Sequence, residues 1–175
     1  DDDCDGQIDE GCNAILPPAN DIWANAVNIV STGNVYPNCS IINGTIVGAT
    51  DSPESIQQNV ITGEDVWYKF TALSSAARIR LYNLVFDGSL EIYTQSGTLV
   101  ESENLSGIGG QEIMNITSLN QGNQYYLAVR NYNSYSGTGT FSLCIQHLLP
   151  SYCASGNGSF ELCSNLKPAW TGANQ

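Results

Sequence analysis

The chain has 175 residues, with seventeen acidic against five basic side chains and a net charge of −12. This charge disfavours binding to nucleic acid and to anionic membrane surfaces. The sequence contains no apolar run long enough to span a bilayer, so we expect no membrane span and interpret the chain as a segment of a longer secreted or cell-surface protein.

The chain begins with an acidic stretch in which aspartates alternate. Gly6 follows the third of these aspartates, and apolar Ile8 comes shortly after it. Alternate carboxylates that converge after a glycine turn are typical of an oxygen-rich calcium loop, and the stretch resembles the Asp-rich repeats of thrombospondin type 3 and related bacterial surface proteins. A solvated acidic linker is the alternative. The predicted calcium ligands are Asp1, Asp3, Asp5, Gln7 and Asp9.

Proline pairs and composition divide the chain into three parts. Residues 1–16 form the acidic calcium-binding loop, and Pro17-Pro18 stiffen the link to the next part. Residues 19–149 are predicted to form the main domain. Residues 151–175 contain a Cys-closed hairpin candidate and the start of a further domain.

The main domain has the period-two pattern of β-strands. Apolar and polar residues alternate most clearly over residues 66–71, 78–82, 125–130 and 141–146, and more weakly over 27–30, 45–49, 89–94, 98–102 and 111–117. Glycine-containing turn signals, including Asn43-Gly44, separate these runs. The pattern predicts an all-β, antiparallel, jelly-roll-like sandwich in which each sheet has one face in water. Residues 20–28 alone allow a helical turn.

Six cysteines suggest disulfide bonds in an oxidising, extracellular setting. Fifteen pairings are possible, and the sequence alone does not choose among them. Proximity along the chain favours Cys4–Cys12 and Cys153–Cys163, which leaves Cys39–Cys144 to join the start of the main domain to its end. No Cys-x-x-Cys motif indicates a zinc site.

Residues 19–147 resemble the bacterial pre-peptidase C-terminal domain, a calcium-associated sandwich found beside secreted enzymes and in large surface proteins. The order and spacing of several short motifs carry the resemblance, and the whole chain is similar to large secreted proteins of the Bacteroidota. The motifs are Ala19-Asn20-Asp21, Asn25-Ala26, Gly44-Thr45, Glu64 to Phe70, Ser89 to Tyr93, Gln124 to Val129 and Gly139 to Leu143.

This resemblance implies a second calcium site between the start of the domain and the approach to its third strand. The matching residues are Asn20, Asp21, Glu64 and Asp65, although Pro18 and Ala19 stand where the family has a further glutamate. The alternative is structural, with Asp21 capping a turn and Asp65 opening a strand.

The sequence offers no signal for catalysis. The single histidine, His147, is expected to be structural, and no nucleophile motif is present. Residues 131–139 have the composition of a binding loop, in which Tyr132 and Tyr135 would contact a ligand, or of an ordinary Gly-rich hairpin.

We therefore predict a non-catalytic extracellular module that acts in adhesion or surface-filament architecture, stiffened by calcium. Its partners would be a surface glycan, a protein ligand or copies of itself. The first alternative is a carbohydrate- or protein-binding accessory domain of a secreted hydrolase, and the second is an enzyme with an unrecognised site.

Overall fold

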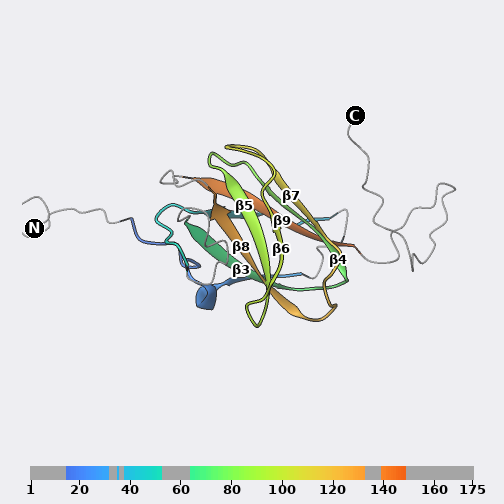
Figure 1. Ribbon diagram of the computed structural model, residues 1–175. Helices are drawn as coiled ribbons and strands as arrows, with labels where there is room; N and C mark the ends of the chain where they lie inside the picture. The colour runs from blue at the N-terminus through green and yellow to red at the C-terminus, as the bar shows by residue number, and fades with distance from the viewer. Residues whose placement is uncertain (1–14, 32–34, 36–37, 53–63, 133–138, 149–175) are drawn as a thin grey trace, which may run out of the picture.

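The computed structural model describes residues 15–31, 35, 38–52, 64–132 and 139–148, which form a β-sandwich (Figure 1). The prediction of an all-β sandwich is confirmed, and the helical turn expected near residue 24 is one short 3-10 helix, η1. The elements are η1 (Trp23–Asn25), β1 (Val27–Ile29), β2 (Ile42–Thr45), β3 (Asp65–Thr71), β4 (Ala76–Tyr82), β5 (Gly88–Thr94), β6 (Leu99–Glu103), β7 (Glu112–Ile116), β8 (Gln124–Asn131) and β9 (Thr140–Leu148).

The strands form two sheets that face each other. The five-stranded sheet has the order β1-β3-β8-β5-β6, and the four-stranded sheet has the order β2-β9-β4-β7. All neighbours are antiparallel except β1 and β3, which run parallel with Val27 opposite Tyr68. The expectation of a wholly antiparallel sandwich is therefore wrong at this edge. A parallel pair needs a long crossover, and here β2 and its flanking segments lie between the two strands in the sequence.

The core lies between the sheets and is built by the predicted alternation. Val66 and Phe70 on β3 face inward from one sheet, and Ile79 and Leu81 on β4 face inward from the other, all without solvent exposure. Leu127 of β8 joins the same cluster. Burying a large aliphatic or aromatic side chain contributes about 1.5–3 kcal/mol, so this cluster is the main source of stability.

The prediction of a strand over residues 45–49 is wrong, because β2 ends at Thr45. Gly48 has a φ of 76°, and the amide of Ala49 donates to the carbonyl of Ile46 over 3.0 Å, so the chain turns here. Asn43-Gly44 was expected to be a turn and instead lies inside β2. Glycine is needed because a Cβ at Gly44 would overlap the ring of Phe141 on β9.

The five-stranded sheet also buries much of its outer face, which was expected to be wet. Trp67, Glu91, Tyr93 and Arg130 point away from the core, yet none is more than 4% exposed. Trp23 of η1 covers part of this face, with its ring centroid 4.9 Å from that of Trp67 and 3.9 Å from that of Tyr126. A second apolar cluster therefore lies outside the main core. Its members are Trp23, Ala26, Trp67, Tyr93, Leu99, Tyr126 and Ala128.

Candidate functional site

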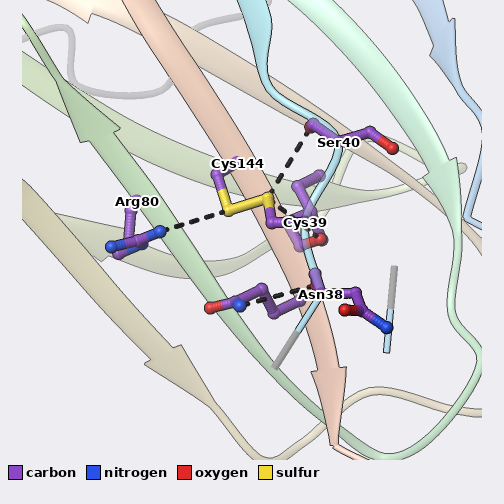
Figure 2. The surroundings of a disulfide bond; sticks show 7 residues. Asn38, Cys39, Ser40, Arg80 and Cys144 are labelled. Carbon is purple, nitrogen blue, oxygen red and sulfur yellow. Dashed lines mark hydrogen bonds between the residues drawn. A yellow bond between two sulfur atoms is a disulfide. The ribbon is translucent and has the colours of Figure 1, made fainter. Parts of the chain in front are cut away.

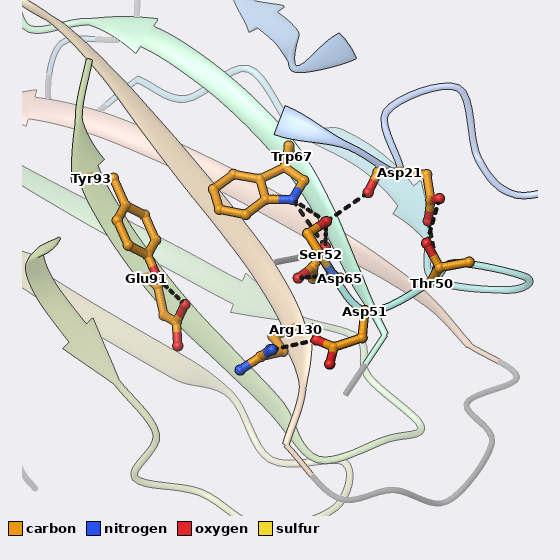
Figure 3. A network of polar contacts seen from close by, with 9 residues as sticks. All are labelled: Asp21, Thr50, Asp51, Ser52, Asp65, Trp67, Glu91, Tyr93 and Arg130. Atoms are coloured by element: carbon orange, nitrogen blue, oxygen red, sulfur yellow. Dashed lines mark hydrogen bonds and ion pairs between the residues drawn. The ribbon is translucent and has the colours of Figure 1, made fainter. Parts of the chain in front are cut away.

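A buried polar network lies on the outer side of the five-stranded sheet, where residues 50–52 meet the start of β3 (Figure 3). Asp65 opens β3 and is fully buried. Its carboxylate accepts from the hydroxyl of Ser52 over 2.6 Å, from the amide of Ser52 over 3.2 Å and from the indole N–H of Trp67 over 2.9 Å. The indole also lies 2.9 Å from the Ser52 hydroxyl oxygen. Three donors therefore fix this carboxylate against the sheet.

Burial raises the pKa of Asp65 to about 6. The hydrogen bonds from Ser52 and Trp67 and the charge of Arg130 act in the opposite direction, but they only partly offset the loss of hydration. Arg130 stands directly opposite Asp65 on β8 and forms a 2.6 Å ion pair with Asp51. The network is thus a place where a carboxyl group titrates near neutral pH.

Each residue of the predicted second calcium site has a hydrogen-bond partner in the protein. Asp21 accepts from the amide of Thr50 over 2.6 Å and from its hydroxyl over 2.8 Å. The side-chain amide of Asn20 donates to the carbonyl of Trp67 over 3.0 Å.

The fourth residue of this set, Glu64, lies 3.4 Å from the side-chain amide of Asn131. Within the described ranges, no three His, Cys, Asp or Glu side chains gather as a metal ion would require. Calcium binding by the four residues stays a prediction.

Sequence reasoning missed Thr50 and Ser52, which supply most of the donors in this network. The signal was a short run of small polar residues, Thr50-Asp51-Ser52, placed just after the Gly48 turn. Such side chains readily hydrogen-bond to nearby carboxylates and backbone groups. The same face carries a second polar contact, in which the hydroxyl of Tyr93 donates to the carboxylate of Glu91 on β5.

The disulfide between Cys39 and Cys144 confirms the predicted pairing of these two cysteines (Figure 2). Its Cα atoms are 5.9 Å apart, within the usual range, and the bond spans a sequence separation of 105 residues. Cys144 is fully buried in β9, and Cys39 lies on the segment leading into β2. A guanidinium nitrogen of Arg80 lies 3.7 Å from the Cys144 sulfur. The bond therefore ties the beginning of the sandwich to its last strand.

Several predicted residues fall outside the described ranges. These are the calcium loop Asp1, Asp3, Asp5, Gln7 and Asp9, the pairs Cys4–Cys12 and Cys153–Cys163, and Tyr135. Tyr132 is described. It follows β8 directly, is partly exposed, and its amide donates to the carbonyl of Asp87 over 2.7 Å. A ligand-binding role for the two tyrosines stays a prediction.

His147 lies on β9 without solvent exposure, with its ring centroid 5.9 Å from that of Phe70. Burial lowers its pKa to about 4, so the ring is neutral at physiological pH. Phe70 is five residues from Asp65 along β3, or about 16 Å at the rise of a strand. The two described groups with strongly shifted pKa values are therefore too far apart to act as an acid–base pair.

Comparisons with known proteins gave little beyond the fold. No family model matches the chain, and no curated protein matches it. Among solved structures, the pre-peptidase C-terminal domain of a collagenase from Bacillus anthracis is similar, with a TM-score of 0.47 and 18% identity over 69% of this chain and 94% of that chain. Membership of that family stays a prediction from the sequence motifs. In the described part of the chain, no helix has the length and apolar character that crossing a bilayer demands.

Proposed function

We propose that the chain is a non-catalytic extracellular module of a large secreted or surface protein, acting in adhesion or surface-filament architecture. The observation that carries this proposal is the Cys39–Cys144 disulfide, which closes nearly the whole sandwich into one covalent ring. Structural disulfides persist in oxidising compartments outside the cytosol. Cys144 is fully buried and Cys39 is partly buried, and this placement supports a stabilising role for the bridge.

Calcium stiffening at the N-terminal loop is part of the same proposal. The alternating carboxylates of Asp1, Asp3 and Asp5 repel one another, and a divalent cation would remove that repulsion. Because Cys12 stands where a complete loop has a bidentate glutamate, we expect a weak site with a Kd on the order of 10⁻⁴–10⁻³ M. Such a site fits a protein bathed in millimolar calcium and would fix the loop relative to the sandwich.

Sedimentation velocity on the purified chain, with calcium and with a chelator, tests the architectural role. We expect end-to-end association that grows with calcium and weakens in the double variant Asp3→Ala, Asp5→Ala. The matched control is Glu101→Ala, Glu103→Ala, which removes the same charge from β6. A monomer under all conditions, or equal weakening by both double variants, would contradict the filament reading.

The accessory-domain alternative depends on the loop after β8. Tyr132 is partly exposed at the end of the sandwich, and aromatic side chains in loops of this composition contribute contact area to a ligand. Replacing Tyr132 and Tyr135 by Ala should abolish binding to a glycan array and leave the melting temperature nearly unchanged. A large loss of stability would show that the rings pack into the protein and would remove this alternative.

A further inference from the structure

The outer face of the four-stranded sheet carries two arginines side by side along β4. Ala77, Ile79 and Leu81 of this strand point into the core, so Arg78 and Arg80 point outward, where both are half-buried. Strand pairing places Arg78 between Asn115 of β7 and Gln146 of β9, and Arg80 between Ile113 of β7 and Cys144 of β9. The two guanidinium groups therefore sit over the middle of the sheet and not at its edge.

The described strands of this sheet bring positive charge to its outer face in a strongly acidic protein. The four strands of the sheet contain a single acidic residue, Glu112, which is fully buried and accepts from the amides of Leu105 over 2.7 Å and Ser106 over 2.9 Å. The remaining described acids belong to the other sheet or to loops: Asp21, Asp51, Glu64, Asp65, Asp87, Glu91, Glu101 and Glu103. Among the described residues of these four strands, Arg78 and Arg80 are therefore the charged side chains on the outer face.

Arg80 is held in place and keeps most of its hydrogen-bonding capacity. Its guanidinium carbon lies 5.6 Å from the ring centroid of Tyr82, and one nitrogen lies 3.7 Å from the Cys144 sulfur, which is a weak acceptor (Figure 2). Its Nε has no hydrogen-bond partner, and no carboxylate of the described ranges lies within ion-pair distance. A guanidinium has five N–H donors, so this one remains able to bind an anion with two parallel hydrogen bonds.

We propose that this face binds a glycan that carries carboxylate groups. Arg80 and Arg78 would bind the carboxylates, the partly exposed ring of Tyr82 would pack against a sugar ring, and the exposed amide of Asn115 would bind hydroxyl groups. The net charge of −12 opposes nucleic acids and other dense polyanions, which favours carboxylates spaced along an otherwise neutral chain. The inference rests on the proposed adhesive role, for which it names the ligand class.

Calorimetry on the full chain in a chelator tests the proposal, since the chelator prevents calcium from bridging carboxylates. The probes are two sialylated oligosaccharides that differ in linkage, and the methyl ester of one of them. We expect binding of at least one acid form and none of the ester, which has the same sugar units without charge. The double variant Arg78→Gln, Arg80→Gln should weaken binding at least tenfold, because hydrogen bonds to charged groups are strong. Arg80→Lys should weaken it partially, since it keeps the charge and loses the planar fork.

The matched control is Lys69→Gln, which removes one positive charge from the outer face of the other sheet and should leave affinity unchanged. Failure of the wild-type chain to bind either acid probe, equal binding of the methyl ester, or an equal loss in the control would overturn the proposal. A peptide with the sequence of residues 1–14 represents an acidic protein ligand. Tighter binding of this peptide than of either glycan would also overturn the proposal. End-to-end association of the double variant Arg78→Gln, Arg80→Gln is measured separately from glycan binding. The result therefore shows whether the glycan site or the architectural role has failed.

Discussion

Removing the Cys39–Cys144 disulfide should take away a large part of the stability of the sandwich. We consider the double variant Cys39→Ala, Cys144→Ala, which leaves no unpaired thiol behind. The bond closes a loop with a sequence separation of 105 residues. In the chain-entropy model, a cross-link over about 100 residues stabilises the folded state by about 4.7 kcal/mol, because the unfolded chain loses conformational freedom. The total stability of a domain is typically about 5–15 kcal/mol, so the variant should be marginal.

Urea unfolding followed by tryptophan fluorescence measures the effect, because Trp67 is fully buried and reports on the sandwich. We expect a loss of about 3–5 kcal/mol and a steeper dependence on urea, since a chain without the cross-link exposes more surface when it unfolds. Ser40→Ala, beside the bridge, is the control and should change stability by less than about 0.5 kcal/mol. A loss below about 1 kcal/mol with an unchanged slope would refute the reasoning.

Three further predictions concern the polar network, the second strand and the N-terminal loop. The pKa of Asp65 is about 6 in the folded protein, against 3.8 when unfolded. This shift stabilises the folded state at low pH, and the stabilisation is lost as the pH rises through 6. We compare the unfolding free energy of the wild type with that of Asp65→Asn at each pH. The difference, wild type minus variant, should fall by about 3 kcal/mol from pH 3.5 to pH 7, and a constant difference would contradict this prediction. Gly44→Ala should lower the unfolding free energy by about 1–3 kcal/mol in urea, because its methyl group overlaps Phe141, and a neutral result would show that the ring moves freely. Calorimetry should detect calcium uptake that Asp3→Ala, Asp5→Ala abolishes, and equal uptake by both proteins would place the ion elsewhere.

The sequence predicted the position of most strands well. Alternation and turn signals located every described strand except β2 to within about two residues, because one face of each strand had to meet the core. The Cys39–Cys144 pair was favoured once the close cysteines were set aside, and the structure confirms it. These features depend on local patterns, which a single sequence contains.

The features that were missed depend on contacts between distant segments. Gly44 was interpreted as a turn residue, but it serves the close approach of β2 to Phe141 on β9, about a hundred residues away. Trp67 and Asp65 occupy the polar positions of an alternating strand, and nothing nearby in the sequence shows that Trp23 and Ser52 cover them. Within the predicted second calcium set, Asp21 and Asp65 each accept hydrogen bonds from residues of the protein that sequence reasoning did not single out.

The Cys39–Cys144 bond also determines how the module responds to a pulling force applied at its two ends. Under such a force the load passes from the N-terminal segment through the disulfide into β9, and the residues between the two cysteines carry none of it. Without the bond, the segment between the two cysteines, with its sequence separation of 105, could extend to a length of about 350 Å once the sandwich unfolds. With the bond, those residues stay folded or unfold without lengthening the molecule, so an array of such modules would keep its length while it holds a load.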